Sequence, residues 1–135
     1  MKSLFPDVCT EKLAASRDFY RELLGFEVVF ENDWYVQLRD PRAPAAQIAF
    51  VEQGHPSVPA GHGRAPQGVI VTMELEDAAA CHARARALGL EVVYPLEDEA
   101  WGQRHFMVLD PNGLLVDVVE LIPPAPGYQG YVAEP

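Results

Sequence analysis

The stretch LLGFEVVF, residues 23–30, returns 64 residues later as ALGLEVVY, residues 87–94. Five of the eight letters are identical, and Phe30 is matched by Tyr94. A repeat at this spacing, about half the length of a 135-residue chain, indicates two copies of one structural module. In both copies a glycine separates a helical pattern from a run of β-branched residues, which predicts a helix that ends and a strand that begins.

The residues before each of these glycines predict a helix. Over residues 10–24 apolar side chains recur every three to four positions, as on one buried helical face, with Thr10 as the expected N-cap. Over residues 77–88 an alanine-rich segment follows Asp77, a second N-cap residue. The glycine after each segment supplies a left-handed stop.

Apolar runs bounded by turn residues predict the strands. Besides a first strand around Phe5 and Asp7, they cover residues 26–31, 34–39, 45–52, 68–75, 90–95 and 105–121. The last run is folded back by DPNG, residues 110–113, a sequence typical of a hairpin turn. Each half therefore reads strand, helix, three strands, and the predicted fold class is α+β with two tandem βαβββ modules.

A segment rich in glycine and proline divides the halves. It predicts a linker over residues 54–67, between a first module at about 1–53 and a second at about 68–122. Both modules belong to a single domain, residues 1–123. Prolines and glycines predict an extended tail over residues 124–135.

The charge and the hydropathy pattern exclude several kinds of partner. A net charge of -10 argues against nucleic acid and against anionic membrane surfaces. No segment approaches about 18 consecutive apolar residues, and the first residues lack the apolar run of a signal peptide. Two cysteines, Cys9 and Cys81, suit a reducing compartment. We therefore expect a cytoplasmic protein.

Two segments resemble a known family. SRDFYRELLGFEVVF (16–30) and WGQRHFMVLDPNGLLVDVVE (101–120) are similar to signature sequences of the vicinal-oxygen-chelate superfamily, which includes glyoxalase I, bleomycin-resistance proteins, fosfomycin-resistance transferases and extradiol dioxygenases. The resemblance implies curled mixed sheets that form a ligand cup with the helices outside. It also implies a homodimer. Because the superfamily hosts many chemistries, it implies no single activity.

The resemblance also identifies the positions where metal-dependent members carry ligands. They fall on Phe5, Ile70, the neighbourhood of Ala49 with Gln47 two residues away, and Asp117. A catalytic divalent site needs about three ligands from His, Asp, Glu or Cys. Only Asp117 qualifies, so we expect no metal and no other cofactor.

Strand alternation, together with the resemblance, predicts the lining of a binding site. Aromatic rings could hold a cation, with Asp7 and Asp117 as countercharges. For some of these residues a structural role is also open: Phe5 and Met107 as core residues, His105 and Asp117 as a contact pair, and Arg104 as a partner of a carboxylate such as Glu99. The predicted ligand-binding residues are Phe5, Asp7, Tyr35, Gln37, Thr72, Trp101, Arg104, His105, Met107 and Asp117.

Three functions fit these observations. The first is metal-independent sequestration of a small hydrophobic or cationic molecule, as in antibiotic resistance. The second is a lyase, isomerase or dioxygenase with an atypical metal site or with metal-free acid–base chemistry, which a His105–Asp117 pair could perform. The third is a sensing or partner-binding module that uses the tail PPAPGYQGYVAEP. The sequence favours the first and leaves turnover open.

Overall fold

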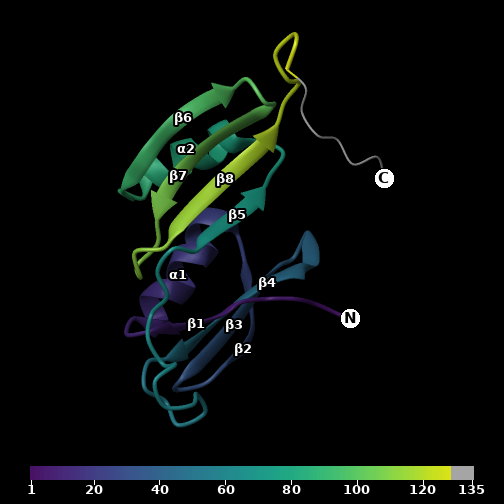
Figure 1. Ribbon diagram of the computed structural model, residues 1–135. Helices are drawn as coiled ribbons and strands as arrows, with labels where there is room; N and C mark the ends of the chain where they lie inside the picture. The colour runs from purple at the N-terminus through teal and green to yellow at the C-terminus, as the bar shows by residue number, and fades with distance from the viewer. Residues whose placement is uncertain (129–135) are drawn as a thin grey trace. The chain divides into compact units, whose positions relative to one another are not determined.

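The computed structural model describes residues 1–128, and it confirms two tandem βαβββ modules (Figure 1). The first contains β1 (Asp7–Thr10), α1 (Leu13–Leu24), β2 (Glu27–Glu31), β3 (Tyr35–Asp40) and β4 (Ala43–Glu52). The second contains β5 (Ile70–Glu74), α2 (Ala78–Ala87), β6 (Val92–Glu99), β7 (Gln103–Leu109) and β8 (Leu115–Leu121). Much of the predicted tail, residues 129–135, lies outside the described residues.

Each module forms one four-stranded mixed sheet, and the two sheets have the same topology. The strand orders are β1-β4-β3-β2 and β5-β8-β7-β6. The first strand of each sheet pairs in parallel with the last, and all other pairs are antiparallel. The repeated sequence thus produces a repeated topology.

Helix α1 covers one face of the first sheet. Val36 and Leu38 of β3 and Ile48 and Phe50 of β4 are fully buried on that face. Burying an apolar side chain of this size contributes about 1.5–3 kcal/mol. Because successive side chains of a strand point to opposite faces, the residues between these four lie on the face that carries no helix.

The ends of α1 agree only partly with the sequence. Gly25 ends the helix in the left-handed conformation, with φ of 70°, as predicted. Thr10 is not the N-cap, because it is the last residue of β1 and its Oγ1 accepts a hydrogen bond from the Lys12 amide. The helix begins only at Leu13.

Helix α2 covers the second sheet with small side chains. Asp77 is its N-cap, as predicted, and accepts a hydrogen bond of 2.9 Å from the Ala80 amide. Its buried face consists of Ala78, Cys81 and Ala85. Such small side chains bring the helix close to its sheet.

Strand β6 is longer than predicted. The residues after Pro95, expected to form a short charged loop, continue the strand to Glu99. Irregularities in its pairing with β7 accompany this extension. The extension is important for the site because it places Glu99 opposite Gln103 of β7.

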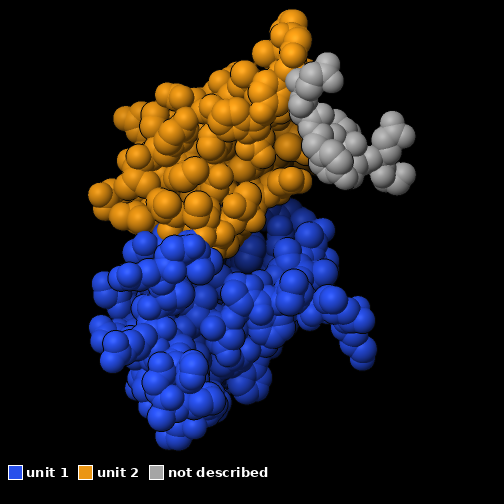
Figure 2. Space-filling model, viewed as in Figure 1, with its two compact units in different colours: residues 1–69, 110–114 blue, residues 70–109, 115–135 orange. Residues whose placement is uncertain are grey.

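The chain divides into two compact units, coloured separately in Figure 2. One contains residues 1–69 with residues 110–114, and the other contains residues 70–109 with the chain from residue 115 onward. The turn between β7 and β8 thus belongs to the first unit. Within residues 1–128, no helix is long and apolar enough to cross a membrane.

Side-chain hydrogen bonds hold the DPNG turn in the first unit. The buried Asp110 accepts hydrogen bonds from the amides of Asn112 (2.8 Å) and Leu114 (2.9 Å), and from the Tyr20 hydroxyl (3.1 Å). The side-chain Nδ2 of Asn112 donates to Ser16 Oγ at 2.9 Å. Burial, and next the charge of Asp110, raises the pKa of Tyr20 well above its usual range. Asp110, Asn112, Ser16 and Tyr20, which stand in the two signature segments, therefore have a structural role.

Candidate functional site

The helix-free face of the second sheet carries a cluster of polar, ionisable and aromatic side chains. Alternation along β7 and β8 places His105 and Met107 beside Asp117 and Val119 on this face. Thr72 of β5 lies opposite Asp117 in the neighbouring pair of strands. Five of the predicted ligand-binding residues are near one another here: Thr72, Trp101, His105, Met107 and Asp117.

His105 is the centre of this face. Its ring is buried, with 5% of the residue exposed. Nδ1 lies 2.8 Å from Oδ1 of Asp117, and Nε2 lies 3.5 Å from Oε1 of Glu99. Nε2 makes no hydrogen bond to any of the described residues. Few buried polar atoms in proteins lack a partner, so this nitrogen is a candidate for contact with a ligand.

Two aromatic rings flank the imidazole. The Tyr94 and Trp101 ring centroids lie 5.0 Å and 6.3 Å from that of His105. Tyr94 donates a hydrogen bond of 2.6 Å to Oε1 of Glu99, and this bond, followed by desolvation, raises the pKa of Tyr94 to about 12. Trp101 is 45% exposed and donates to Gln103. The site therefore combines two carboxylates, one imidazole and two rings.

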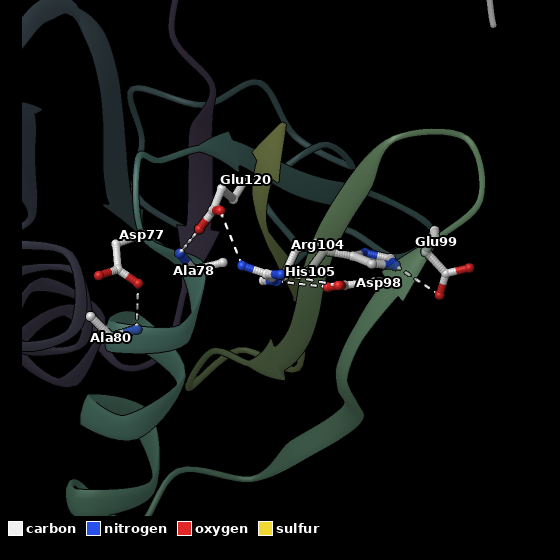
Figure 3. A network of polar contacts seen from close by, with 8 residues as sticks. All are labelled: Asp77, Ala78, Ala80, Asp98, Glu99, Arg104, His105 and Glu120. Atoms are coloured by element: carbon white, nitrogen blue, oxygen red, sulfur yellow. Dashed lines mark hydrogen bonds and ion pairs between the residues drawn. The ribbon is translucent and has the colours of Figure 1, made fainter. Parts of the chain in front are cut away.

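Arg104 does not belong to this group, because it lies on the other face of β7. Its guanidinium lies between two carboxylates, those of Asp98 and Glu120 (Figure 3). The nitrogen–oxygen distances are 2.6 Å to Asp98 and 3.4 Å to Glu120. Glu120 also accepts a hydrogen bond from the Ala78 amide at the start of α2. The hydrogen bond from Arg104 lowers the pKa of Asp98. The ion pair considered for Arg104 forms with these two carboxylates rather than with Glu99.

The helix-free face of the first sheet carries a separate polar chain. Tyr35 donates a hydrogen bond of 2.9 Å to Gln37, which donates to Gln47 on β4. Asp7 lies on β1 beside Ala49 of β4, and partial burial raises its pKa. Desolvation, with a contribution from the Asp7 charge, also raises the pKa of Tyr35.

The positions that hold metal in the superfamily do not fit a metal ion here. Phe5, Ile70 and Ala49 carry no donor atoms in their side chains. The fourth position, Asp117, has one carboxylate oxygen engaged with His105. Across residues 1–128, no group of three or more His, Cys, Asp or Glu side chains is arranged to hold a metal ion.

Sequence reasoning missed three residues of the second face: Tyr94, Glu99 and Gln103. Tyr94 is part of the repeated sequence, where it matches Phe30 of the first copy. Alternation along its strand could therefore have identified it. Glu99 was assigned to a loop, and only the extension of β6 brings it to His105. The pairing of β6 with β7 is irregular, so simple alternation of side chains along β6 would not have predicted the position of Glu99.

Comparison with known proteins identifies the family. Residues 5–118 match the model of the Glyoxalase/Bleomycin resistance protein/Dioxygenase superfamily. The chain belongs to this superfamily, as its signature sequences predicted. No curated protein matches the chain at a significant level.

Solved structures agree on the fold. TioX from Micromonospora sp. ML1 is 19% identical, with a TM-score of 0.76 over 90% of this chain and 100% of its own. The bleomycin resistance determinant encoded on transposon Tn5 is 19% identical, with a TM-score of 0.65 over 90% and 98%. Lactoylglutathione lyase from Agrobacterium tumefaciens is 20% identical, with a TM-score of 0.65 over 87% and 89%. At these identities the likeness establishes the fold alone.

Proposed function

We propose that this protein binds a small hydrophobic or cationic molecule on the helix-free face of its second sheet, without a metal ion. The observation that supports this proposal is the buried His105 between Asp117 and Glu99, next to Tyr94 and Trp101. Apolar and aromatic surface with a few convergent polar groups is typical of small-molecule sites.

The chemistry of this face favours a cation over an anion. The rings of Tyr94 and Trp101 can attract a cation through their faces. Glu99 and Asp117 are largely buried carboxylates that supply countercharge. The net charge of -10 adds a long-range attraction for cations.

Antibiotic resistance is one role that such binding would serve, and a solved relative in fold is named as a bleomycin resistance determinant. We propose sequestration of this kind as the biological role. A homodimer and a cytoplasmic location remain predictions. On the first sheet, Phe5, Asp7, Tyr35 and Gln37 remain predicted contacts for the same class of ligand.

Calorimetric titration with a panel of cationic polyaromatic compounds tests the proposal. We expect at least one compound to bind the wild-type protein. Trp101→Ala should weaken that binding about tenfold or more, because stacking on an aromatic ring is worth about 1–3 kcal/mol. Trp34→Ala is the matched control, because Trp34 lies in the first unit and stacks on His55. Binding that needs added Ni²⁺, Mn²⁺, Fe²⁺ or Zn²⁺ would contradict the metal-independent proposal.

A second candidate is metal-free acid–base catalysis by His105. The specific observation in its favour is the 2.8 Å hydrogen bond to Asp117, which orients the ring, together with an Nε2 that makes no hydrogen bond within residues 1–128. An imidazole held in this way by a carboxylate can transfer a proton at its other nitrogen. In that case a bound compound would be converted, and His105→Gln would abolish conversion. Binding without conversion favours sequestration.

A further inference from the structure

We propose that His105 Nε2 and Glu99 Oε1 together form an anchor for a protonated primary or secondary amine of the ligand. This inference rests on the proposed function and names the chemical group that the same site recognises. It is argued from the hydrogen bonds around the two atoms.

The first step concerns the His105 ring. Asp117 accepts the proton of Nδ1 at 2.8 Å, because a carboxylate oxygen can only accept. In the neutral ring, Nε2 then carries the lone pair and is an acceptor. It is buried and makes no hydrogen bond within residues 1–128.

The second step concerns Glu99. Its Oε1 accepts the hydrogen bond of Tyr94 at 2.6 Å, which holds the carboxylate in place, and it lies 3.5 Å from Nε2. Figure 3 shows His105 and Glu99 facing each other from β7 and β6. Two acceptors at this separation repel each other unless a donor satisfies both.

The third step concerns the ligand. A protonated primary or secondary amine carries at least two N–H groups and a positive charge, so it can donate to Nε2 and to Glu99 at once. A quaternary ammonium has no N–H group, and an alcohol has one O–H and no charge. The anchor therefore selects among ligands that the flanking rings alone would accept equally.

Trp101 lies at the edge of the anchor. Its ring meets that of His105 edge-on, at 68°, yet nearly half of the residue is exposed. It lies between β6 and β7, next to Gly102, whose φ is 102°. Nε2 itself is buried, so a neighbouring side chain has to shift before an amine can reach it, and the half-exposed Trp101 is the one that we expect to shift.

Three probes of matched shape test the anchor: phenethylamine, its N,N,N-trimethyl derivative and 2-phenylethanol. Their binding is followed by the fluorescence of Trp101 in a Trp34→Phe background, since the chain has two tryptophans. We expect the primary amine to bind at least about tenfold more tightly than the other two, as charge-assisted hydrogen bonds are worth about 1.5–3 kcal/mol.

Three variants complete the test, of which the first two each remove one negative charge. Glu99→Gln should abolish the preference for the primary amine, because the new amide can itself donate to Nε2. Glu91→Gln, at an exposed position just before β6, should keep the preference. Tyr94→Phe, which removes the hydrogen bond that holds Glu99, should reduce the preference for the primary amine.

The outcomes separate the anchor from the proposed function. Equal binding of both cations would overturn the anchor and leave cation binding intact, as expected if His105 is an imidazolium that already donates to Glu99. A preference that survives Glu99→Gln would also overturn it. If none of the probes binds at millimolar concentration, both the anchor and the cationic form of the proposed function fail.

Discussion

At the scale of single residues, the contact between His105 on β7 and Asp117 on β8 orients the imidazole and leaves Nε2 without a hydrogen bond within residues 1–128. The ring is held by Asp117 on one side and faces Glu99 on the other. The sequence indicated that His105 and Asp117 share a face, because strand alternation is regular in β7 and β8. It could not predict the 2.8 Å bond, because side-chain rotamers are set by packing.

Tyr94 provides a prediction at this scale. Because Glu99 accepts its hydrogen bond, Tyr94 should ionise at about pH 12, and Glu99→Gln should bring its pKa down toward the usual value near 10. The stabilisation from this protonated phenol is complete below about pH 10 and is lost as the pH rises to about 12. Ultraviolet difference titration of wild type against Tyr94→Phe measures the ionisation. A Tyr94 that ionises with the exposed tyrosines would show that the bond does not form in solution.

Asp110 provides a second prediction. Asp110→Ala leaves the amides of Asn112 and Leu114 and the Tyr20 hydroxyl without their acceptor, and should lower the free energy of unfolding by about 3 kcal/mol. Tyr20→Phe removes only one of these bonds, and should cost about 1 kcal/mol. Urea denaturation measures both values. Asp33→Ala, at an exposed position, is the control and should change stability by less than about 0.5 kcal/mol.

At the scale of helices and strands, local sequence signals were reliable where one residue type imposes the geometry. The stop at Gly25 and the cap at Asp77 follow from backbone conformation and from side-chain hydrogen bonding. The start of α1 and the end of β6 were misplaced, because pairing between strands decided them. Thr10 pairs with Glu52 in β1–β4, and Glu99 pairs with Gln103 in β6–β7.

The cap of α2 gives the prediction at this scale. Asp77→Ala removes the acceptor of the Ala80 amide, and should destabilise the protein by about 1 kcal/mol. The neighbouring exposed residue provides the control, Glu76→Ala, which removes a charge without removing the cap. Thermal and urea denaturation of the two variants measure the difference. Equal loss in both would mean that charge near the helix start, rather than the cap, is responsible.

At the scale of the whole molecule, charge is the dominant feature. The chain carries 20 acidic and 10 basic residues, so its folded state is under net repulsion. Exposed ion pairs such as Arg39–Glu27 offset little of this, because surface pairs contribute less than about 1 kcal/mol. Screening should therefore stabilise the protein.

The corresponding prediction concerns salt. Raising NaCl from about 10 mM to about 150 mM, where the screening length is about 8 Å, should raise the melting temperature. Scanning calorimetry measures the change, and KCl in place of NaCl tests for specific ion effects. A melting temperature that falls with both salts would show that the ion pairs outweigh the repulsion.

The repeat made the overall architecture predictable from the sequence, because two similar helix-to-strand joints at this spacing require two similar modules. The function was less accessible. The signature residues of the superfamily include Asp110 and Asn112, which hold a turn, while the ring of Tyr94 and the carboxylate of Glu99 stand outside the signatures.

The turn between β7 and β8 also limits how the chain can be divided. Its Asp110 and Asn112 bond to Tyr20 and Ser16, so a second module expressed from residue 68 onward would lack the donors and acceptors that complete its own hairpin. The two halves share one topology, but the hairpin of the second is completed by side chains of the first. A gene split within residues 54–67 should yield folded protein only when both fragments are produced together, as circular dichroism of the separate and co-produced fragments would measure.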